Sequence, residues 1–215
     1  MVLTSRKKRP LNRTIPCLRD TSLIIIAAEG EFTEKQYFES SLFRNRRIQV
    51  MVLETENGHS APIHVYKRLK EYAQVVNLEP DDQLWLMVDK DRWPDNQLAQ
   101  VCSHAIRGRK KAMLAISNPS FELWLYLHID DWTAGVITSQ AMERDLRAKL
   151  GSYNKSNLDI QILKPGIENA VKRSKELDNN TSARWPSNPG THVYKVIEEI
   201  WKLTENFEKN EKQRT

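Results

Sequence analysis

The chain has 215 residues and a formal net charge of +5, with 40% hydrophobic and 28% charged residues. These values are typical of an ordinary globular protein of one domain, or one domain with an appendage, and the mild positive charge is compatible with a polyanionic partner. Cys17 and Cys102 form neither a CxxC pair nor a zinc-ligand set, and no apolar stretch approaches the roughly 20 residues that cross a bilayer. No signal peptide is recognisable, so we expect a cytoplasmic protein without disulfides or a membrane partner.

The two ends of the sequence are charged and lack hydrophobic periodicity. Residues 1–21 are rich in Lys and Arg and contain two prolines. We interpret them as a flexible basic arm, which either is a solvated terminus or supplies phosphate contacts. Residues 208–215 are predicted to form a charged tail.

Between residues 22 and 130, short apolar runs alternate with segments of helical period. Thr33 is a candidate helix N-cap with Gln36 as its capping-box partner. Asn118 is a second candidate N-cap, followed by Pro119 in the first helical position. The apolar runs predict strands at 23–28, 48–53, 83–89 and 112–117, and the periodic segments predict helices at 33–43, 61–76, 95–106 and 119–128.

The alternation predicts an α/β domain over residues 22–130, with a parallel sheet flanked by helices. Its strands are continuous apolar runs, as expected when helices cover both faces of the sheet. Residues 131–207 are predicted to be a helical C-terminal region, in which Thr138 and Thr191 cap helices and Gly151 ends one. The helices of this region are predicted at 139–150, 166–177 and 191–207.

Acidic residues follow two of the predicted strands. The first strand, in LIIIAAEGEFTE, ends at Glu29-Gly30, and LWLMVDKD ends with Asp89 and Asp91. Ligands of open α/β sheets bind at the carboxyl ends of the strands. Two carboxylates side by side repel unless a cation lies between them, so we expect these three acids to meet and bind Mg²⁺ or Mn²⁺. The alternative is that the DKD turn is only a solvated surface.

Glu122 lies in the almost wholly apolar stretch FELWLYL, which is predicted to be buried. A buried carboxylate needs a partner, so Glu122 either faces the same metal pocket or is paired with a helix N-terminus or a basic side chain. We interpret His128 as a packing residue. The sequence contains no GxxxxGK[ST] loop and no GxSxG elbow, which argues against intrinsic ATPase activity and against a serine hydrolase.

Several stretches carry a resemblance to known proteins. The Glu29-Gly30 turn and the VDKD strand end resemble the Toprim fold of topoisomerases, primases and OLD-type nucleases. Over residues 22–203 the chain resembles the RloB-like family of bacterial defence-associated proteins, in EGEFTEKQYF, SNPSFELWLYLH and NPGTHVYKVIEEI. The resemblance implies a Toprim-like α/β domain and a Mg²⁺-dependent nuclease of phage defence and abortive infection, encoded beside an ABC- or SMC-like ATPase.

The resemblance also implies roles for individual residues. Glu29 matches the Toprim glutamate, and Asp89 and Asp91 match its DxD metal ligands, so these three are the expected catalytic residues. Glu34 matches the second acid of the EGxxTE block and Glu122 the acid of the FELW block, and both are expected in the metal set.

Three further residues are candidates for contact with nucleic acid. Tyr153 and Lys155, in GSYNKS, match a Tyr/Lys pair of the family, and Lys90 lies between the two aspartates. For Lys155, a plain surface position is the alternative. For the chain as a whole, the alternative to a nuclease is a non-catalytic module that binds nucleic acid or the ATPase. DNA and RNA, including tRNA, are both open as substrates, and so is the oligomeric state.

Overall fold

The computed structural model describes residues 19–55, 60–135, 137–186 and 189–212. Most of the predicted basic arm, with Cys17, lies outside these ranges, as do the last three residues of the predicted tail. Cys102 is buried and is a free thiol. Among the described helices, none is both long enough and apolar enough to cross a membrane.

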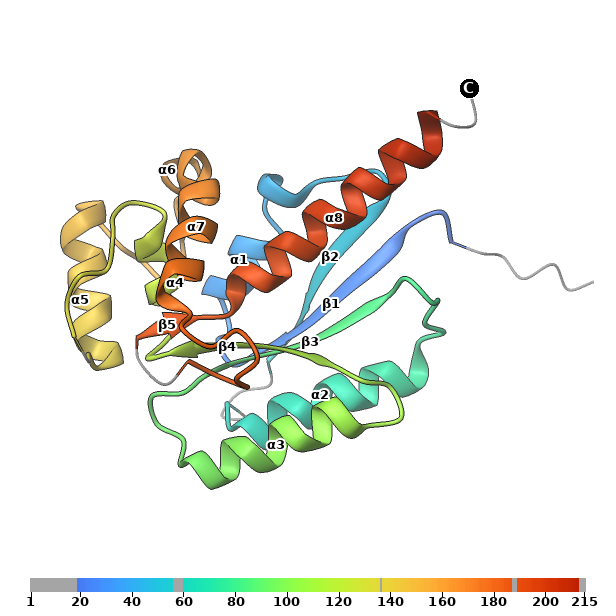
Figure 1. Cartoon of the computed structure of the whole chain (residues 1–215), viewed down its shortest axis with the longest axis horizontal. Coiled ribbons are helices and arrows are strands. Elements are labelled where there is room, and N and C mark those ends of the chain that lie inside the picture. The colour runs from blue at the N-terminus through green and yellow to red at the C-terminus, as the bar shows by residue number, and fades with distance from the viewer. Residues whose placement is uncertain (1–18, 56–59, 136, 187–188, 213–215) are drawn as a thin grey trace, which may run out of the picture.

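A five-stranded sheet with the order β2-β1-β3-β4-β5 forms the centre of the molecule (Figure 1). The first four strands are parallel, and β5 pairs antiparallel with β4. This architecture confirms the predicted α/β fold class and is consistent with a Toprim-like fold. The strands are β1 (Ser22–Ala28), β2 (Ile48–Leu53), β3 (Gln83–Asp89), β4 (Met113–Asn118) and β5 (Gly190–Thr191).

Helices cover both faces of the sheet. One face carries α2 (Pro62–Val75) and α3 (Asp95–Arg107), and the other carries α1 (Thr33–Phe38) and the long α8 (Val193–Lys212) (Figure 1). The remaining helices gather beyond the carboxyl ends of the strands (Figure 1). They are α4 (Glu122–Leu127), α5 (Ser139–Leu150), α6 (Ile160–Leu163) and α7 (Ile167–Leu177), with short 3₁₀ turns at Ser41–Phe43 and Lys164–Gly166.

The two-sided covering explains why the central strand β1 is apolar from Leu23 to Ala28. Side chains alternate across a strand, so Ile24 and Ile26 enter the core beneath α1 and α8, whereas Leu23 and Ile25 enter the core beneath α2 and α3. Every residue of β1 is buried. A strand buried on both faces cannot show the polar alternation of a half-exposed one.

The N-terminal capping prediction for the first helix is wrong. Thr33 is the first residue of α1, Phe32 precedes it, and no side chain caps the helix. The hydroxyl of Thr33 and the amide of Gln36 instead donate to the backbone oxygen of Lys155, at 3.2 and 2.9 Å. A tertiary contact has therefore taken the polar groups that a capping box would use. The helix also ends at Phe38, before a separate 3₁₀ turn, rather than at residue 43.

The predicted start of the fourth helix is also wrong. Asn118 is still part of β4, where it pairs with Gly190, and its side-chain amide donates to the oxygen of Pro186 at 3.0 Å. The Asn118–Pro119 peptide bond is cis. The helix itself begins at Glu122, so Asn118 cannot cap it.

In the C-terminal region, two of the predicted helix signals are confirmed. Thr138 accepts the N–H of Ala141 at 3.2 Å, and Gly151 has a φ of +73° where α5 ends. The prediction missed β5, because Gly190 and Thr191 join the sheet and α8 begins only at Val193. The region after residue 130 thus adds a strand and a face-covering helix to the sheet.

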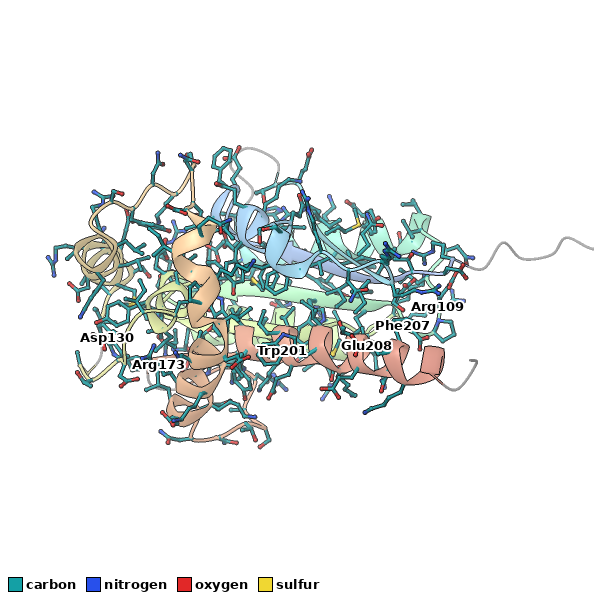
Figure 2. All side chains as sticks on the ribbon, turned by 90° about the horizontal axis from the view of Figure 1, so that it is seen from above. Arg109, Asp130, Arg173, Trp201, Phe207 and Glu208 are labelled. Atoms are coloured by element: carbon teal, nitrogen blue, oxygen red, sulfur yellow. The ribbon has the colours of Figure 1, made fainter. Side chains whose placement is uncertain are left out.

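The α4 helix is held tightly by the C-terminal helices. Arg173 of α7 donates to the oxygen of Leu127 at 2.8 Å, at the end of the molecule where Figure 2 labels it beside Asp130. A Cβ atom on Gly166 would lie 2.0 Å from the oxygen of His128, so only glycine fits this approach. Buried His128 has partners for both ring nitrogens, the oxygen of Leu163 at 2.8 Å and the hydroxyl of Tyr37 at 3.0 Å.

Candidate active site

The carboxyl ends of β1, β3 and β4 surround a small hollow of about 210 Å³, here called the acidic pocket. All five residues predicted to bind metal line it: Glu29, Glu34, Asp89, Asp91 and Glu122. The other lining residues are Gly30, Glu31, Phe32, Thr33, Ser60, Arg92, Ser120, Phe121, Ser139 and Lys155.

Glu29 is placed by the end of β1 and is 6% exposed. Its Oε2 accepts the backbone N–H of Asp89 at 3.2 Å and the indole N–H of Trp93 at 3.1 Å. Its Oε1 accepts from Arg92 at 3.1 Å. Burial raises the pKa of Glu29 to about 7, although Trp93, the Asp89 N–H and Arg92 all favour the carboxylate.

Glu34 lies on the first turn of α1 and folds back onto the β1 turn, where it is 5% exposed. Its Oε1 accepts the N–H of Gly30 at 3.1 Å. A Cβ atom on Gly30 would lie 2.1 Å from Oε2, so the glycine makes room for this carboxylate. Burial, with smaller contributions from Glu122 and Glu29, raises the pKa of Glu34 to about 7.

Asp89 ends β3, and Asp91 follows in the turn to α3. The turn is fixed by the backbone, because Lys90 N–H donates to the oxygen of Ser117 at 2.8 Å and Asp91 N–H to that of Pro119 at 3.2 Å. Burial and then the neighbouring carboxylates, Glu29 first among them, hold the pKa of Asp89 well above its usual range. The pocket therefore brings together carboxyl groups whose burial and mutual repulsion oppose their ionisation.

Glu122 differs from Glu29 and Glu34 in that its partners lower its pKa in spite of burial. Its Oε1 lies 2.7 Å from Nζ of Lys155 and accepts from Tyr153 at 3.3 Å, and its Oε2 accepts from Ser120 at 2.6 Å. Burial by itself would raise the pKa of Glu122, but Lys155 and Ser120 together lower it below the usual value. The same Lys155 amino group lies 3.0 Å from Glu143 on α5.

The three candidates for nucleic-acid contact have different surroundings. Lys155 lines the acidic pocket and its side chain is 49% exposed. Tyr153 is buried, 7% exposed, and its hydroxyl donates to Oε1 of Glu122. Lys90 lies outside the pocket lining and pairs with Asp95 on the first turn of α3, at 3.2 Å.

The donor set suits an oxygen-preferring cation, but its arrangement is not that of a preassembled metal site. Within the ranges that the structure describes, no group of three or more His, Cys, Asp or Glu side chains is arranged to hold a metal ion. Two cations of the chain are present instead, Arg92 on Glu29 and Lys155 on Glu122. A divalent ion of the kind that binds carboxylates and retains water would require these side chains to move.

Sequence reasoning missed four residues that shape this pocket: Arg92, Trp93, Ser120 and Glu143. Arg92 and Trp93 directly follow the DxD pair, and Ser120 lies two residues before Glu122, so proximity to the acids was an available signal. No sequence signal pointed to Glu143, because only the tertiary structure brings α5 to Lys155.

The fold and the site together define an α/β protein with a carboxylate-lined pocket at the carboxyl ends of parallel strands. The chain belongs to the RloB-like family, because the model of the RloB-like proteins matches residues 24–200. No curated protein and no solved structure matches the chain. The family resemblance expected from the sequence is thereby confirmed.

Proposed function

We propose that this protein is a Mg²⁺- or Mn²⁺-dependent nuclease of the Toprim type, which hydrolyses phosphodiester bonds in RNA, such as tRNA, or in DNA. In this proposal it works in the bacterial cytoplasm in phage defence, under the control of a partner ATPase. The observation that carries the proposal is the convergence of Glu29, Glu34, Asp89, Asp91 and Glu122 on one pocket. Three of the five, Glu29, Glu34 and Glu122, are buried, and carboxyl groups whose pKa values are shifted by burial and by one another cluster at functional sites.

The proposed ligands are the acids from two strand ends, Glu29 after β1 and Asp89 and Asp91 from β3, with Glu34 and Glu122 beside them. A bound divalent ion would polarise the phosphate and stabilise charge on its oxygens. The alternative role for Glu29, in place of metal ligation, is to accept a proton from the attacking water, for which the raised pKa of about 7 suits it. Trp93 fixes its orientation through the 3.1 Å bond to Oε2.

In the same proposal, two basic residues change partners. Arg92 pairs with Glu29 at 3.1 Å, and Lys155 pairs with Glu122 at 2.7 Å. The side chain of Arg92 is 66% exposed and that of Lys155 is 49% exposed, so both have room to turn toward solvent. Released by a metal ion, their cationic groups would contact the phosphate oxygens of a nucleic acid, which guanidinium and ammonium groups bind well.

The second candidate is a non-catalytic module that binds nucleic acid or the partner ATPase. One observation favours it: among the described residues no set of ligands is ready to hold a metal, and internal cations occupy the acids. In that case the acidic pocket would be a polar network that specifies the fold.

The test compares cleavage of tRNA, single-stranded RNA, plasmid DNA and linear DNA, with Mn²⁺ calorimetry on the same protein samples. Asp89→Asn is the test variant, and Asp81→Asn, which changes an exposed aspartate before β3, is the matched control. We expect Asp89→Asn to lose both cleavage and Mn²⁺ binding, while Asp81→Asn retains them. Retention of tight Mn²⁺ binding by Asp89→Asn, or no Mn²⁺ binding by the wild type, would reject the metal site.

A further inference from the structure

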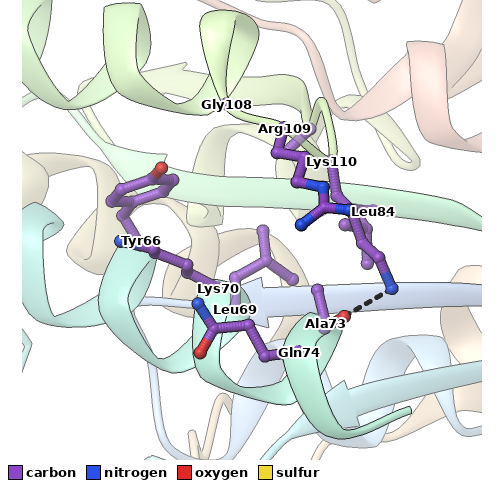
Figure 3. Close-up of a pocket in the computed structure, with 10 residues that line it drawn as sticks. Tyr66, Leu69, Lys70, Ala73, Gln74, Leu84, Gly108, Arg109 and Lys110 are labelled. Carbon is purple, nitrogen blue, oxygen red and sulfur yellow. Dashed lines mark hydrogen bonds between the residues drawn. The ribbon is translucent and has the colours of Figure 1, made fainter. Parts of the chain in front are cut away.

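A second and larger hollow lies at the opposite end of the sheet from the acidic pocket. It has a volume of about 570 Å³ and lies between the second half of α2 and the loop from α3 to β4 (Figure 3). Its lining includes Leu84 and Ala112, at the amino-terminal ends of β3 and β4. Figure 2 shows the separation, because Arg109 of this hollow and Asp130, after α4, are at opposite ends of the view. We call this hollow the basic pocket.

The charge of the basic pocket has one sign. Its lining contains Lys70, Arg109 and Lys110 and, among the residues that the structure describes, no Asp or Glu. Lys70 and Arg109 are exposed and make no ion pair within the described ranges. Four of the five residues 107–111 are basic. The positive charges of this run favour an anion beside it.

One of the three cations is held in place. Nζ of Lys110 donates to the oxygen of Ala73 at 2.6 Å and to that of Val76 at 3.4 Å, at the carboxyl end of α2 (Figure 3). This anchors the α3–β4 loop to α2 and fixes the rim of the pocket. Arg109, next to it in the chain, is thereby positioned beside the opening (Figure 3).

The floor of the pocket is apolar, unlike its rim. Leu69 and Leu84 are 1% and 5% exposed, and Tyr66 forms one wall with its ring (Figure 3). The Tyr66 hydroxyl donates to the oxygen of His104 at 3.2 Å, which fixes the ring. The volume lies within the roughly 300–1,000 Å³ of small-molecule sites.

We propose that the basic pocket binds a nucleotide, with the base against Tyr66 and the leucines and the phosphates against Lys70 and Arg109. An aromatic ring with an anionic tail matches both the apolar floor and the cationic rim. A purely anionic ligand leaves the floor unused, and an acidic peptide lacks a flat ring to fill it. The nucleotide unit comes either from a free nucleotide or from the end of a nucleic-acid strand.

The test is calorimetric titration of the full chain in EDTA with ATP, GTP, AMP, tripolyphosphate and a 5′-phosphorylated trinucleotide. EDTA removes divalent ions, so the acidic pocket cannot bind phosphate through a metal. The test variant is Lys70→Glu/Arg109→Glu. The control is Lys67→Glu, a single charge reversal on α2 at a side chain that is 69% exposed, pairs with Glu71 at 3.7 Å and is outside the lining. Circular dichroism confirms that each variant is folded.

We expect saturable binding of a nucleotide that the double variant weakens about tenfold or more, equivalent to about 1.4 kcal/mol. Lys67→Glu and Asp89→Asn should bind it as the wild type does. Tighter binding of the trinucleotide identifies a strand end as the source, and tighter binding of a mononucleotide identifies a free nucleotide. No binding, equal binding by the double variant, or tripolyphosphate binding as tight as that of ATP overturns the proposal. Nuclease activity is a separate readout, because it depends on the acidic pocket.

Discussion

Glu34→Gln is expected to stabilise the protein in the absence of divalent ions, although it changes a buried side chain. Gln can keep the bond from the Gly30 N–H, because its oxygen replaces Oε1, which accepts that bond at 3.1 Å. It has almost the same shape as Glu but carries no charge. The substitution therefore removes the cost of holding a carboxylate away from water beside Glu122 and Glu29.

The size of the effect follows from the pKa of Glu34, which burial raises from 4.5 to about 7. Each pKa unit corresponds to about 1.36 kcal/mol, so the full effect is about 3 kcal/mol. Below pH 4.5 the carboxyl is protonated in both folded and unfolded chains and costs nothing. As the pH rises to about 7, the unfolded chain ionises more readily, so the wild type loses stability that the Gln variant retains.

Urea unfolding in EDTA at pH 4 and pH 8 measures this difference. We expect nearly equal free energies of unfolding at pH 4 and a more stable variant, by up to about 3 kcal/mol, at pH 8. If Glu34 is a metal ligand, added Mn²⁺ should stabilise the wild type more than the variant and reduce the difference between their free energies of unfolding. A variant that is less stable than the wild type at pH 8 would refute the reasoning.

Three other perturbations have defined outcomes. Arg92→Gln should strengthen Mn²⁺ binding about two- to fivefold in calorimetry, because the exposed guanidinium no longer competes for Glu29, and weaker binding would contradict this. Gly166→Ala should cost about 1–3 kcal/mol in urea unfolding because of its contact with the His128 oxygen, whereas Gly135→Ala, with open space around it, should change stability by less than about 0.5 kcal/mol. Burial lowers the pKa of His128 from 6.5 to about 4. Between pH 7 and pH 4 the wild type should therefore lose about 3 kcal/mol more of its free energy of unfolding than His128→Asn does. Parallel profiles of unfolding free energy against pH for the two proteins would reject this account.

The location of the acids at the strand ends was predictable because it depends on local patterns. Leu23–Ile26 is a continuous apolar run that must be buried on both faces, and a parallel sheet flanked by helices is the usual way to achieve this. In such a sheet the carboxyl ends of the strands lie at one edge, so Glu29 and Asp89 had to approach each other. All five predicted metal-binding residues accordingly line one pocket.

The partners of these acids were decided by the tertiary structure. Lys155 reaches Glu122 across 33 residues of chain, and its backbone oxygen takes the hydroxyl of Thr33, more than a hundred residues away. A capping box and a tertiary hydrogen bond compete for the Thr33 hydroxyl. The local sequence shows only the capping box, because the tertiary acceptor lies more than a hundred residues away. The sequence by itself therefore determined which ionisable groups are present and at which edge of the sheet they lie. The pairing of these acids with Arg92 and Lys155 was decided by the tertiary structure, because Coulomb interactions depend on distances in space rather than along the chain.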